Sequence, residues 1–252
     1  MPARARCRLD VALVDRGLAA SRERARALIL AGRVRVSGAV VTKSGAGVRP
    51  DEPIDVAERD FPWVGRGGVK LAHALDAFRI DVTGREGLDI GASTGGFTDV
   101  LLQRGARRVV ALDVGHGQLD WRLREDPRVV VLERRNARQL DRAWLPAPAD
   151  IVTLDVSFIS LRLILPRVPP VLAERADIVA LVKPQFEAGR EEVGRGGLVQ
   201  DPAVHEKVLA KVTGAAAACG LARVAMTPSP IAGATGNREF LLHLRPAAAP
   251  GS

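Results

Sequence analysis

Residues 87–98 read Gly-Leu-Asp-Ile-Gly-Ala-Ser-Thr-Gly-Gly-Phe-Thr, an apolar run that ends in a glycine-rich turn. A helical pattern follows, with Val100, Leu101 and Leu102 ahead of the stop signal Arg104-Gly105. The segment therefore predicts a strand, a tight loop and a helix. Glycines let a backbone come close to a ligand, and a helix N-terminus offers free N–H groups. Open α/β sheets bind nucleotide-like ligands at such a turn.

Seven strand-like runs, including the one just quoted, alternate with helical segments along most of the chain. They occupy residues 88–90, 108–114, 129–132, 150–155, 178–183, 223–226 and 239–244. The last two have no helix between them and predict an antiparallel pair. Continuous apolar strands that alternate with helices predict an α/β fold with a mostly parallel, seven-stranded, Rossmann-like sheet covered on both faces.

Positive charge is concentrated at the start of the chain. Residues 1–49 hold eleven arginines or lysines and three acids, so they carry the whole net charge of +8, and the remainder is neutral. Such a basic module predicts contact with the phosphate backbone of a nucleic acid. The alternative is a solvated, arginine-rich face.

The chain has 252 residues, enough for one large domain and a small one. It holds no apolar run of about 18 residues, so we expect no membrane helix. No apolar signal segment follows Met1. Cys7 and Cys219 lack metal-ligand spacing, so we expect a reduced, cytoplasmic protein without a metal. The oligomeric state stays open.

The basic module has its own pattern of short elements. A helix is predicted from Leu9 until Gly17, and Ser21 is a plausible N-cap for a helix over 22–30. Residues 33–41 alternate like a hairpin. These features resemble the S4 RNA-binding domain. The candidate RNA-binding residues are Arg4, Arg6, Arg22, Arg26, Arg33 and Arg35.

An acidic, proline-marked segment follows, and it predicts a domain boundary near residue 60. We expect an RNA-binding domain over 1–60, a catalytic domain over 61–246 and a disordered tail over 247–252. Trp63 and Val64 pack either where the two domains meet or in the core of one domain.

Polar residues close the five strands of the predicted parallel sheet, where ligands bind in such folds. Asp113 lies 22 residues after Gly91, the spacing at which a carboxylate accepts hydrogen bonds from a ribose diol. Ser93 replaces the second glycine of the dinucleotide fingerprint, so the fit to NAD is poor. S-adenosylmethionine fits better. Asn136 is a candidate adenine contact or an ordinary loop cap.

Residues 91–95 also match the G-x-S-x-G nucleophile elbow of α/β hydrolases. Asp155, with His205 or His243, would complete a triad around Ser93. No His-Gly-Gly stretch precedes the elbow, however, and the pattern around His205 is typical of an exposed helix residue. A hydrolase would not explain the basic module, and the sequence disfavours it.

Long motifs carry a close resemblance to one family. They are residues 89–98, 113–119, 155–160, 181–187 and 236–239. The chain resembles the TlyA (hemolysin-A-like) family, which joins an S4 domain to an FtsJ-like ribose methyltransferase domain. The resemblance implies S-adenosylmethionine-dependent 2′-O-methylation of cytidine in ribosomal RNA, 16S or 23S or both. The complete basic N-terminus resembles the longer form of the family, which modifies the RNA of both ribosomal subunits.

The family's catalytic tetrad falls on Lys70, Asp155, Lys183 and Glu239. A lysine beside a ribose hydroxyl can accept its proton or stabilise the developing oxyanion, and Lys183 is the candidate. The cofactor-binding candidates are Asp89, Gly91, Ser93, Thr94, Gly95, Gly96, Phe97, Asp113, Val114 and Asn136. Two other functions stay open: a non-catalytic RNA-binding or ribosome-assembly factor, and a nicotinamide oxidoreductase.

Overall fold

The computed structural model describes residues 6–19, 21–30, 32–56 and 61–247. Contacts divide the chain into two compact units, Met1–Pro62 and Trp63–Ser252, which are described separately. Arg4 and the tail from residue 248 onward lie outside the described residues, so the predictions for them are not addressed by the structure.

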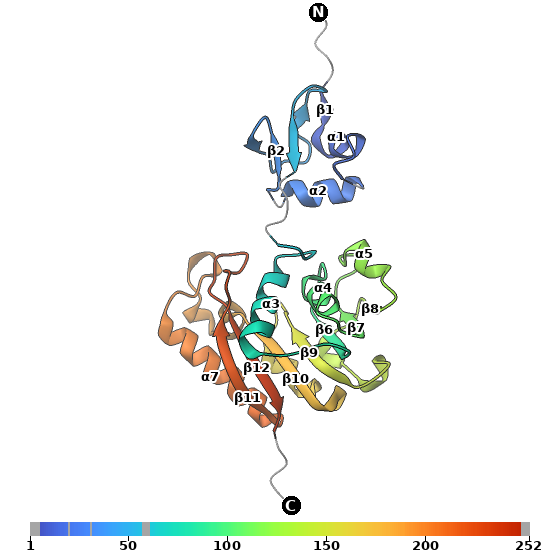
Figure 1. The fold of residues 1–252 in the computed structure, drawn as a ribbon. Coiled ribbons are helices and arrows are strands. Elements are labelled where there is room, and N and C mark those ends of the chain that lie inside the picture. The colour runs from blue at the N-terminus through green and yellow to red at the C-terminus, as the bar shows by residue number, and fades with distance from the viewer. Residues whose placement is uncertain (1–5, 20, 31, 57–60, 248–252) are drawn as a thin grey trace, which may run out of the picture. The chain divides into compact units, whose positions relative to one another are not determined.

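The smaller unit contains two short helices and small antiparallel strands (Figure 1). Its elements are β1 (Cys7–Arg8), α1 (Leu9–Asp15), α2 (Arg22–Leu30), β2 (Val34–Val36), β3 (Ala39–Val40), β4 (Gly47–Val48) and β5 (Ile54–Val56). The predicted cap at Ser21 is present, because the Arg24 backbone N–H donates to Ser21 Oγ at 3.2 Å. Leu9, Leu13 and Ile29 are fully buried and form the centre of the core.

The larger unit is built around a seven-stranded sheet in the order β11-β12-β10-β9-β6-β7-β8. Its strands are β6 (Glu86–Ile90), β7 (Arg108–Leu112), β8 (Val129–Leu132), β9 (Ala149–Leu154), β10 (Leu172–Val182), β11 (Leu221–Pro228) and β12 (Phe240–Pro246). β12 runs antiparallel to β10 and to β11, and the other pairs are parallel. The predicted fold is therefore confirmed.

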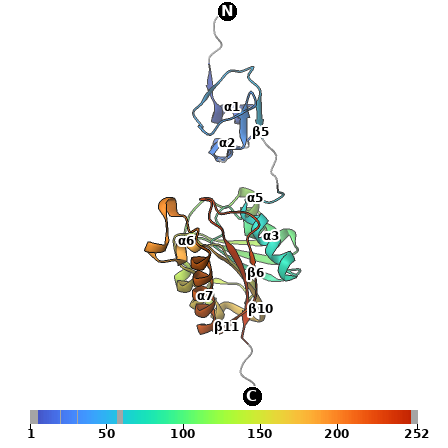
Figure 2. The same cartoon turned by 90° about the vertical axis from the view of Figure 1, so that its left-hand side faces the viewer.

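Helices cover both faces of this sheet. They are α3 (Gly67–Phe78), α4 (Gly96–Gln103), α5 (Trp121–Arg124), α6 (Pro184–Glu187) and α7 (Pro202–Ala218). Alternate residues of β10 divide between two cores: Ala180 packs in the cluster of α7, and Leu181 in the cluster of α3 and α4. Figure 2 shows α7 and α3 on opposite sides of the sheet.

The connection from β9 to β10 is a chain of 3₁₀ turns over 161–171 rather than an α-helix. Pro166, Pro169 and Pro170 lie in this segment. Proline removes a backbone donor and disfavours the α conformation of the residue before it, which explains the short turns.

Trp63 and Val64 pack, half-buried, against the α3 and α4 cluster of the larger unit. A Cβ on Gly68 would lie 2.6 Å from the Trp63 side chain, so the tryptophan needs a glycine there. Trp63 therefore packs against the core of the larger unit, which is what one of the two interpretations expects. Within the described residues, no helix combines the length and the apolarity that crossing a membrane requires.

Candidate active site

The sheet order brings the functional candidates to one edge. Glu239 precedes β12, and Lys183, Asp155 and Asp113 follow β10, β9 and β7. Because β12 is antiparallel, with Phe240 opposite Val182, its start lies beside the carboxyl end of β10. Residues separated by up to 169 positions in the sequence therefore meet at the edge where open α/β sheets bind ligands.

The glycine-rich turn requires glycine at two positions where a Cβ atom would clash. Gly91 has φ +85°, and a Cβ there would lie 2.4 Å from the Asp155 carbonyl oxygen. Gly95 has φ +95°, and a Cβ there would lie 2.2 Å from Leu123. Gly95 is thus closely packed against a leucine side chain, and its predicted contact with the cofactor stays a prediction.

Asp89 supports the turn from below. Its carboxylate is fully buried and accepts hydrogen bonds from the Thr98 backbone N–H at 2.9 Å, from the Thr98 hydroxyl at 2.7 Å and from the Thr153 hydroxyl at 2.8 Å. Burial raises the pKa of Asp89 to about 6, although these hydrogen bonds act in the opposite direction. The structure therefore corrects its predicted role: Asp89 holds the start of α4 and does not reach the cavity.

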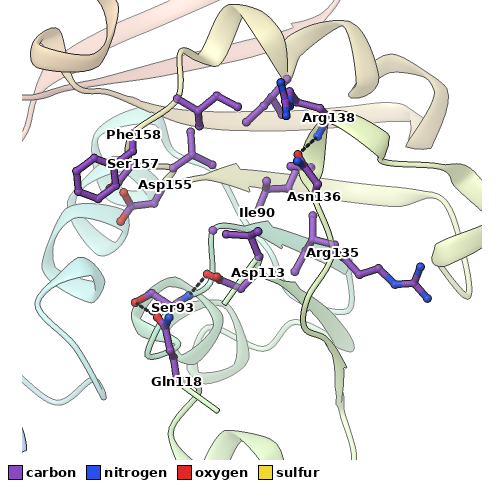
Figure 3. Close-up of a pocket in the computed structure, with 17 residues that line it drawn as sticks. Ile90, Ser93, Asp113, Gln118, Arg135, Asn136, Arg138, Asp155, Ser157 and Phe158 are labelled. Atoms are coloured by element: carbon purple, nitrogen blue, oxygen red, sulfur yellow. Dashed lines mark hydrogen bonds between the residues drawn. The ribbon is translucent and has the colours of Figure 1, made fainter. Parts of the chain in front are cut away.

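A cavity of about 490 Å³ lies beside the turn, and five of the cofactor-binding candidates line it. They are Gly91, Ser93, Asp113, Val114 and Asn136. Asp113 accepts hydrogen bonds from the backbone N–H groups of Ser93 at 2.8 Å and Gly115 at 2.6 Å. Figure 3 shows Asp155, Ser157 and Phe158 together, away from the Ser93–Asp113 pair.

Asn136 is a loop cap that also lies at the larger cavity. Its Oδ1 accepts a hydrogen bond from the Arg138 backbone N–H at 3.0 Å and so caps a 3₁₀ turn. The same residue lines the cavity (Figure 3). The cap fixes the side chain at the wall of the cavity. It uses only the Oδ1 atom and not the amide NH₂ group.

A second, smaller cavity of about 130 Å³ lies on the other side of the turn. It is lined by Gly67, Gly91, Ala92, Ser93, Thr94, Gly96, Phe97 and Asp155. The candidates Thr94, Gly96 and Phe97 are therefore placed here rather than in the larger cavity. Asp155 lines both cavities, which makes it the charged residue that they share.

The predicted tetrad forms two ion pairs. Lys70 Nζ lies 2.5 Å from Glu239 Oε2, and both residues are buried. Lys183 Nζ lies 2.6 Å from Asp155 Oδ1 and donates a hydrogen bond to Ser157 Oγ at 2.8 Å. Each ammonium group thus has its own carboxylate, which offsets the cost of its partial or full removal from water.

Several residues at the site were not among the sequence candidates. Ser157 holds Lys183, and Phe158 is 91% exposed with φ +63°, its ring centroid 5.2 Å from that of Phe186. Glu187, in α6, accepts hydrogen bonds from the Ser160 hydroxyl at 2.5 Å and the Leu161 backbone N–H at 2.6 Å. All of them lie inside the quoted motifs, so the motifs were the available signal.

The histidines decide against the hydrolase interpretation. Each of the four makes its hydrogen bond away from Ser93: His73 to Thr227, His116 to Glu133, His205 to the Val199 carbonyl and His243 to Asp177. Ser93 Oγ instead lies 3.4 Å from Gln118 Oε1. The expectation that His205 is exposed was wrong, because it is buried against Phe240.

The arginine candidates of the smaller unit differ in their surroundings. Arg6 and Arg35 are exposed, and Arg35 donates to the Gly38 carbonyl at 3.1 Å. Arg33 is partly buried. Arg22 and Arg26 share a helix face, as their spacing predicts, and both also bind the carboxylate of Asp10. Over the described part of the chain, no cluster of three or more metal-ligating side chains is placed to hold a metal ion.

Comparisons with known proteins agree with this geometry. Residues 63–246 match the family of FtsJ-like methyltransferases, and residues 7–54 match the S4 domain. The chain is 49% identical to the 16S/23S rRNA (cytidine-2'-O)-methyltransferase TlyA of Mycobacterium tuberculosis, in an alignment that covers 95% of this chain and 90% of that protein.

Two further relatives cover nearly the whole chain. Hemolysin A of Brachyspira hyodysenteriae is 43% identical, over 94% of this chain and 98% of that protein. A solved structure from Streptococcus thermophilus, described as a hemolysin, is 42% identical with a TM-score of 0.77 and covers 98% of this chain and 91% of its own.

Proposed function

Because this chain belongs to the TlyA family of S4-domain, FtsJ-like methyltransferases, we propose that it methylates the ribose 2′-hydroxyl of a cytidine in ribosomal RNA, with S-adenosylmethionine as donor. The RNA is 16S, 23S or both, the two that the name of the Mycobacterium tuberculosis relative gives. The observation that carries the proposal is the Lys183–Asp155 pair, whose carboxylate lines both cavities beside the glycine-rich turn.

The larger cavity fits S-adenosylmethionine in size and in chemistry. Its volume of about 490 Å³ lies within the range of roughly 300–1,000 Å³ that small-ligand pockets occupy. Asp113 offers carboxylate oxygens to a ribose diol, and Asn136 offers an amide to the adenine. The start of α4, which lies beside the smaller cavity, offers backbone N–H groups to the amino-acid end. When bound, this cofactor supplies an electrophilic methyl group.

Lys183 is the residue that we assign to the reacting hydroxyl. A ribose 2′-hydroxyl is a poor nucleophile at neutral pH, so it would have to lose its proton in order to displace the methyl group from its donor. Lys183 Nζ can take that proton when neutral or stabilise the developing oxyanion when charged. Asp155 and Ser157 fix the position of Nζ, which is the contribution that positioned groups make to catalysis.

Lys70 and Glu239 complete the charged cluster. Their pair joins α3 to the start of β12, next to the end of β10 that carries Lys183. We propose that Glu239 holds Lys70 in place, so that the substrate phosphate or the developing oxyanion meets a positioned ammonium group.

The two units divide the work. Residues 1–60 would bind ribosomal RNA or an assembled ribosomal subunit, and residues 61–246 would carry the chemistry. The charge concentrated before residue 50 supports the first assignment, and the cavities and ion pairs support the second. Because ribosomal RNA is the substrate, we place the activity in the cytoplasm.

Mapping ribose methylation tests the proposal. Ribosomal RNA from cells with and without the gene is compared nucleotide by nucleotide, and we expect one or more 2′-O-methylcytidines to disappear from the 16S or 23S RNA of the deletion strain. Complementation with wild type should restore them, and complementation with Lys183→Ala should not. Unchanged RNA in the deletion strain contradicts the proposal.

Cofactor binding separates the remaining alternatives. Calorimetry should show that the purified chain binds S-adenosylmethionine and not NADH. RNA binding without S-adenosylmethionine binding would indicate a non-catalytic assembly factor, and NADH binding would indicate an oxidoreductase.

A further inference from the structure

One acidic side chain lies at the centre of the basic unit. Asp10, in the first turn of α1, is fully buried, and its carboxylate is bound by three arginines. Arg8 binds both oxygens, with Nε at 2.9 Å from Oδ1 and an η-nitrogen at 3.1 Å from Oδ2. An η-nitrogen of Arg22 lies 3.2 Å from Oδ2, and Nε of Arg26 lies 3.1 Å from it.

These hydrogen bonds favour the ionised form of Asp10. The Arg8 hydrogen bonds, aided by those of Arg26 and Arg22, hold the pKa of Asp10 well below its usual range, although burial acts against them. One buried negative charge therefore faces three positive charges, and the cluster keeps a net charge of +2.

The three arginines still have donors for a ligand. Their side chains are 51%, 54% and 52% exposed, whereas Asp10 is wholly covered. A guanidinium has five N–H donors in a planar fork, and Arg22 and Arg26 each use only one nitrogen on Asp10. These half-exposed side chains leave donors for a ligand, and such forks match the geometry of phosphate oxygens.

We propose that Asp10 is a positioning residue that gathers Arg8, Arg22 and Arg26 into one surface for the phosphodiester backbone of the substrate RNA. The proposal rests on the proposed function in naming RNA as the partner, and the net positive charge of the cluster complements the negatively charged phosphodiester backbone. Without Asp10, three like charges repel one another and three long side chains gain rotamer freedom that binding must remove.

The proposal makes a prediction that simple charge counting reverses. Asp10→Asn raises the positive charge of the unit by one, yet it should weaken RNA binding at least about tenfold, as loss of charge-assisted hydrogen bonds does. Asp15→Asn is the matched control, because Asp15 lies in the same helix and is exposed. It makes the same charge change and should leave RNA affinity unchanged or slightly higher.

The measurement is the affinity of the full-length chain for in vitro transcribed 16S and 23S RNA at several salt concentrations. The logarithm of the affinity falls linearly with the logarithm of the salt concentration, and each phosphate contact adds about 0.7–0.9 to the steepness of this slope. With Asp10→Asn the slope should become shallower by the equivalent of roughly one to two contacts. Equal or tighter binding by Asp10→Asn than by Asp15→Asn would overturn the proposal. Polyglutamate is added as a competing acidic peptide. If it displaces the RNA, and does so only when the three arginines are present, the choice of RNA as the partner is also overturned.

A second pair of variants guards against misfolding of Asp10→Asn. Arg22→Lys and Arg26→Lys keep the net charge. They also keep cationic side chains beside Asp10, so its buried carboxylate stays paired. If guanidinium geometry matters, each should weaken RNA binding several-fold; if charge alone matters, both bind as wild type and the proposal fails. Methylation by the wild-type chain tests the proposed function separately, because it does not depend on which residues position the arginines.

Discussion

At the scale of single residues, the two lysines of the site have different surroundings. Lys70 is paired inside the protein with Glu239, whereas the partner of Lys183, Asp155, lines both cavities. Lys183 is also held by Ser157, so its ammonium group has two fixed partners. Substitutions at Lys183 should therefore change the chemical step more than the binding of either substrate.

Lys183→Ala should lower kcat by about 10²–10⁴, the usual contribution of a positioned proton-transfer group, with little change in S-adenosylmethionine affinity. Lys183→Arg should also fail, because arginine stays protonated. Single-turnover methylation and calorimetry make the two measurements. Ser157→Ala is the control that removes only the 2.8 Å hydrogen bond, and it should lose far less. An active Lys183→Arg variant would show that only the positive charge matters.

Asp89 gives the larger unit a pH dependence. Its pKa rises from the usual 3.8 to about 6 on folding, so the unfolded state releases its proton first as the pH rises. The protonated Asp89 therefore contributes to the free energy of unfolding at low pH, and this contribution is lost between about pH 4 and 6. The loss reaches about 3 kcal/mol at neutral pH. Asp89→Asn lacks this titration, so its free energy of unfolding should gain on wild type by up to that amount between pH 4 and 7.

Urea unfolding followed by tryptophan fluorescence can measure this difference, because Trp63, Trp121 and Trp144 all lie in the larger unit. Replacing a hydrogen-bonded carboxylate also has a cost that does not depend on pH. This cost cancels when the difference in unfolding free energy between the two proteins at about pH 4 is compared with that at about pH 7. A difference between wild type and Asp89→Asn that stays the same at both pH values contradicts the raised pKa.

At the scale of elements, α6 fixes the loop that carries Asp155. Glu187 accepts hydrogen bonds from Ser160 and from the Leu161 backbone, and burial raises its pKa despite these bonds. The loop and the Lys183 strand end are therefore joined through one buried side chain, four residues after Lys183. Glu187 therefore links the loop that carries Asp155 to the segment that follows Lys183.

Glu187→Ala should destabilise the larger unit by about 1–3 kcal/mol, because the Leu161 N–H loses its partner in a buried position. It should also lower kcat, since Asp155 and Ser157 lie in the loop that is released. Glu187→Gln keeps an acceptor for the N–H group and a donor for the hydroxyl, so it should restore most of both. Glu206→Ala, on the exposed side of α7, is the control. Equal kcat values for Glu187→Ala and wild type would separate the loop from the chemistry.

At the scale of the whole molecule, charge and chemistry lie in different units. The chain beyond residue 49 has as many acidic as basic residues, whereas the cavities and both ion pairs lie beyond residue 62. RNA affinity and cofactor affinity should therefore separate when the units are separated.

Deletion of residues 1–60 should leave a folded domain that binds S-adenosylmethionine, because the second unit contains its own two hydrophobic clusters. The deletion should nearly eliminate RNA binding and give a shallow salt dependence, since phosphate contacts set that slope at about −0.7 to −0.9 each. Filter binding across a salt series and calorimetry measure the two affinities. Equal slopes for the full-length and truncated chains would place the RNA on the catalytic unit.

The sequence by itself determined most of the larger elements and their order along the chain. Apolar periodicity, caps and glycine stops are local signals, so they predicted α1, the Ser21 cap of α2, the seven strands and the glycine-rich turn. The long motifs, read as a family resemblance, also identified Lys70, Asp155, Lys183 and Glu239 as a set, although not which lysine pairs with which carboxylate.

Only the tertiary structure decided burial and pairing. Lys70 meets Glu239 across 169 positions, and Asp10 draws together arginines from β1 and α2. Asp89, a cofactor candidate by sequence, is enclosed by threonines from α4 and β9. Such contacts depend on how distant segments pack, and the free energy of a charge depends on what covers it. Neither quantity is encoded in the local pattern around the residue.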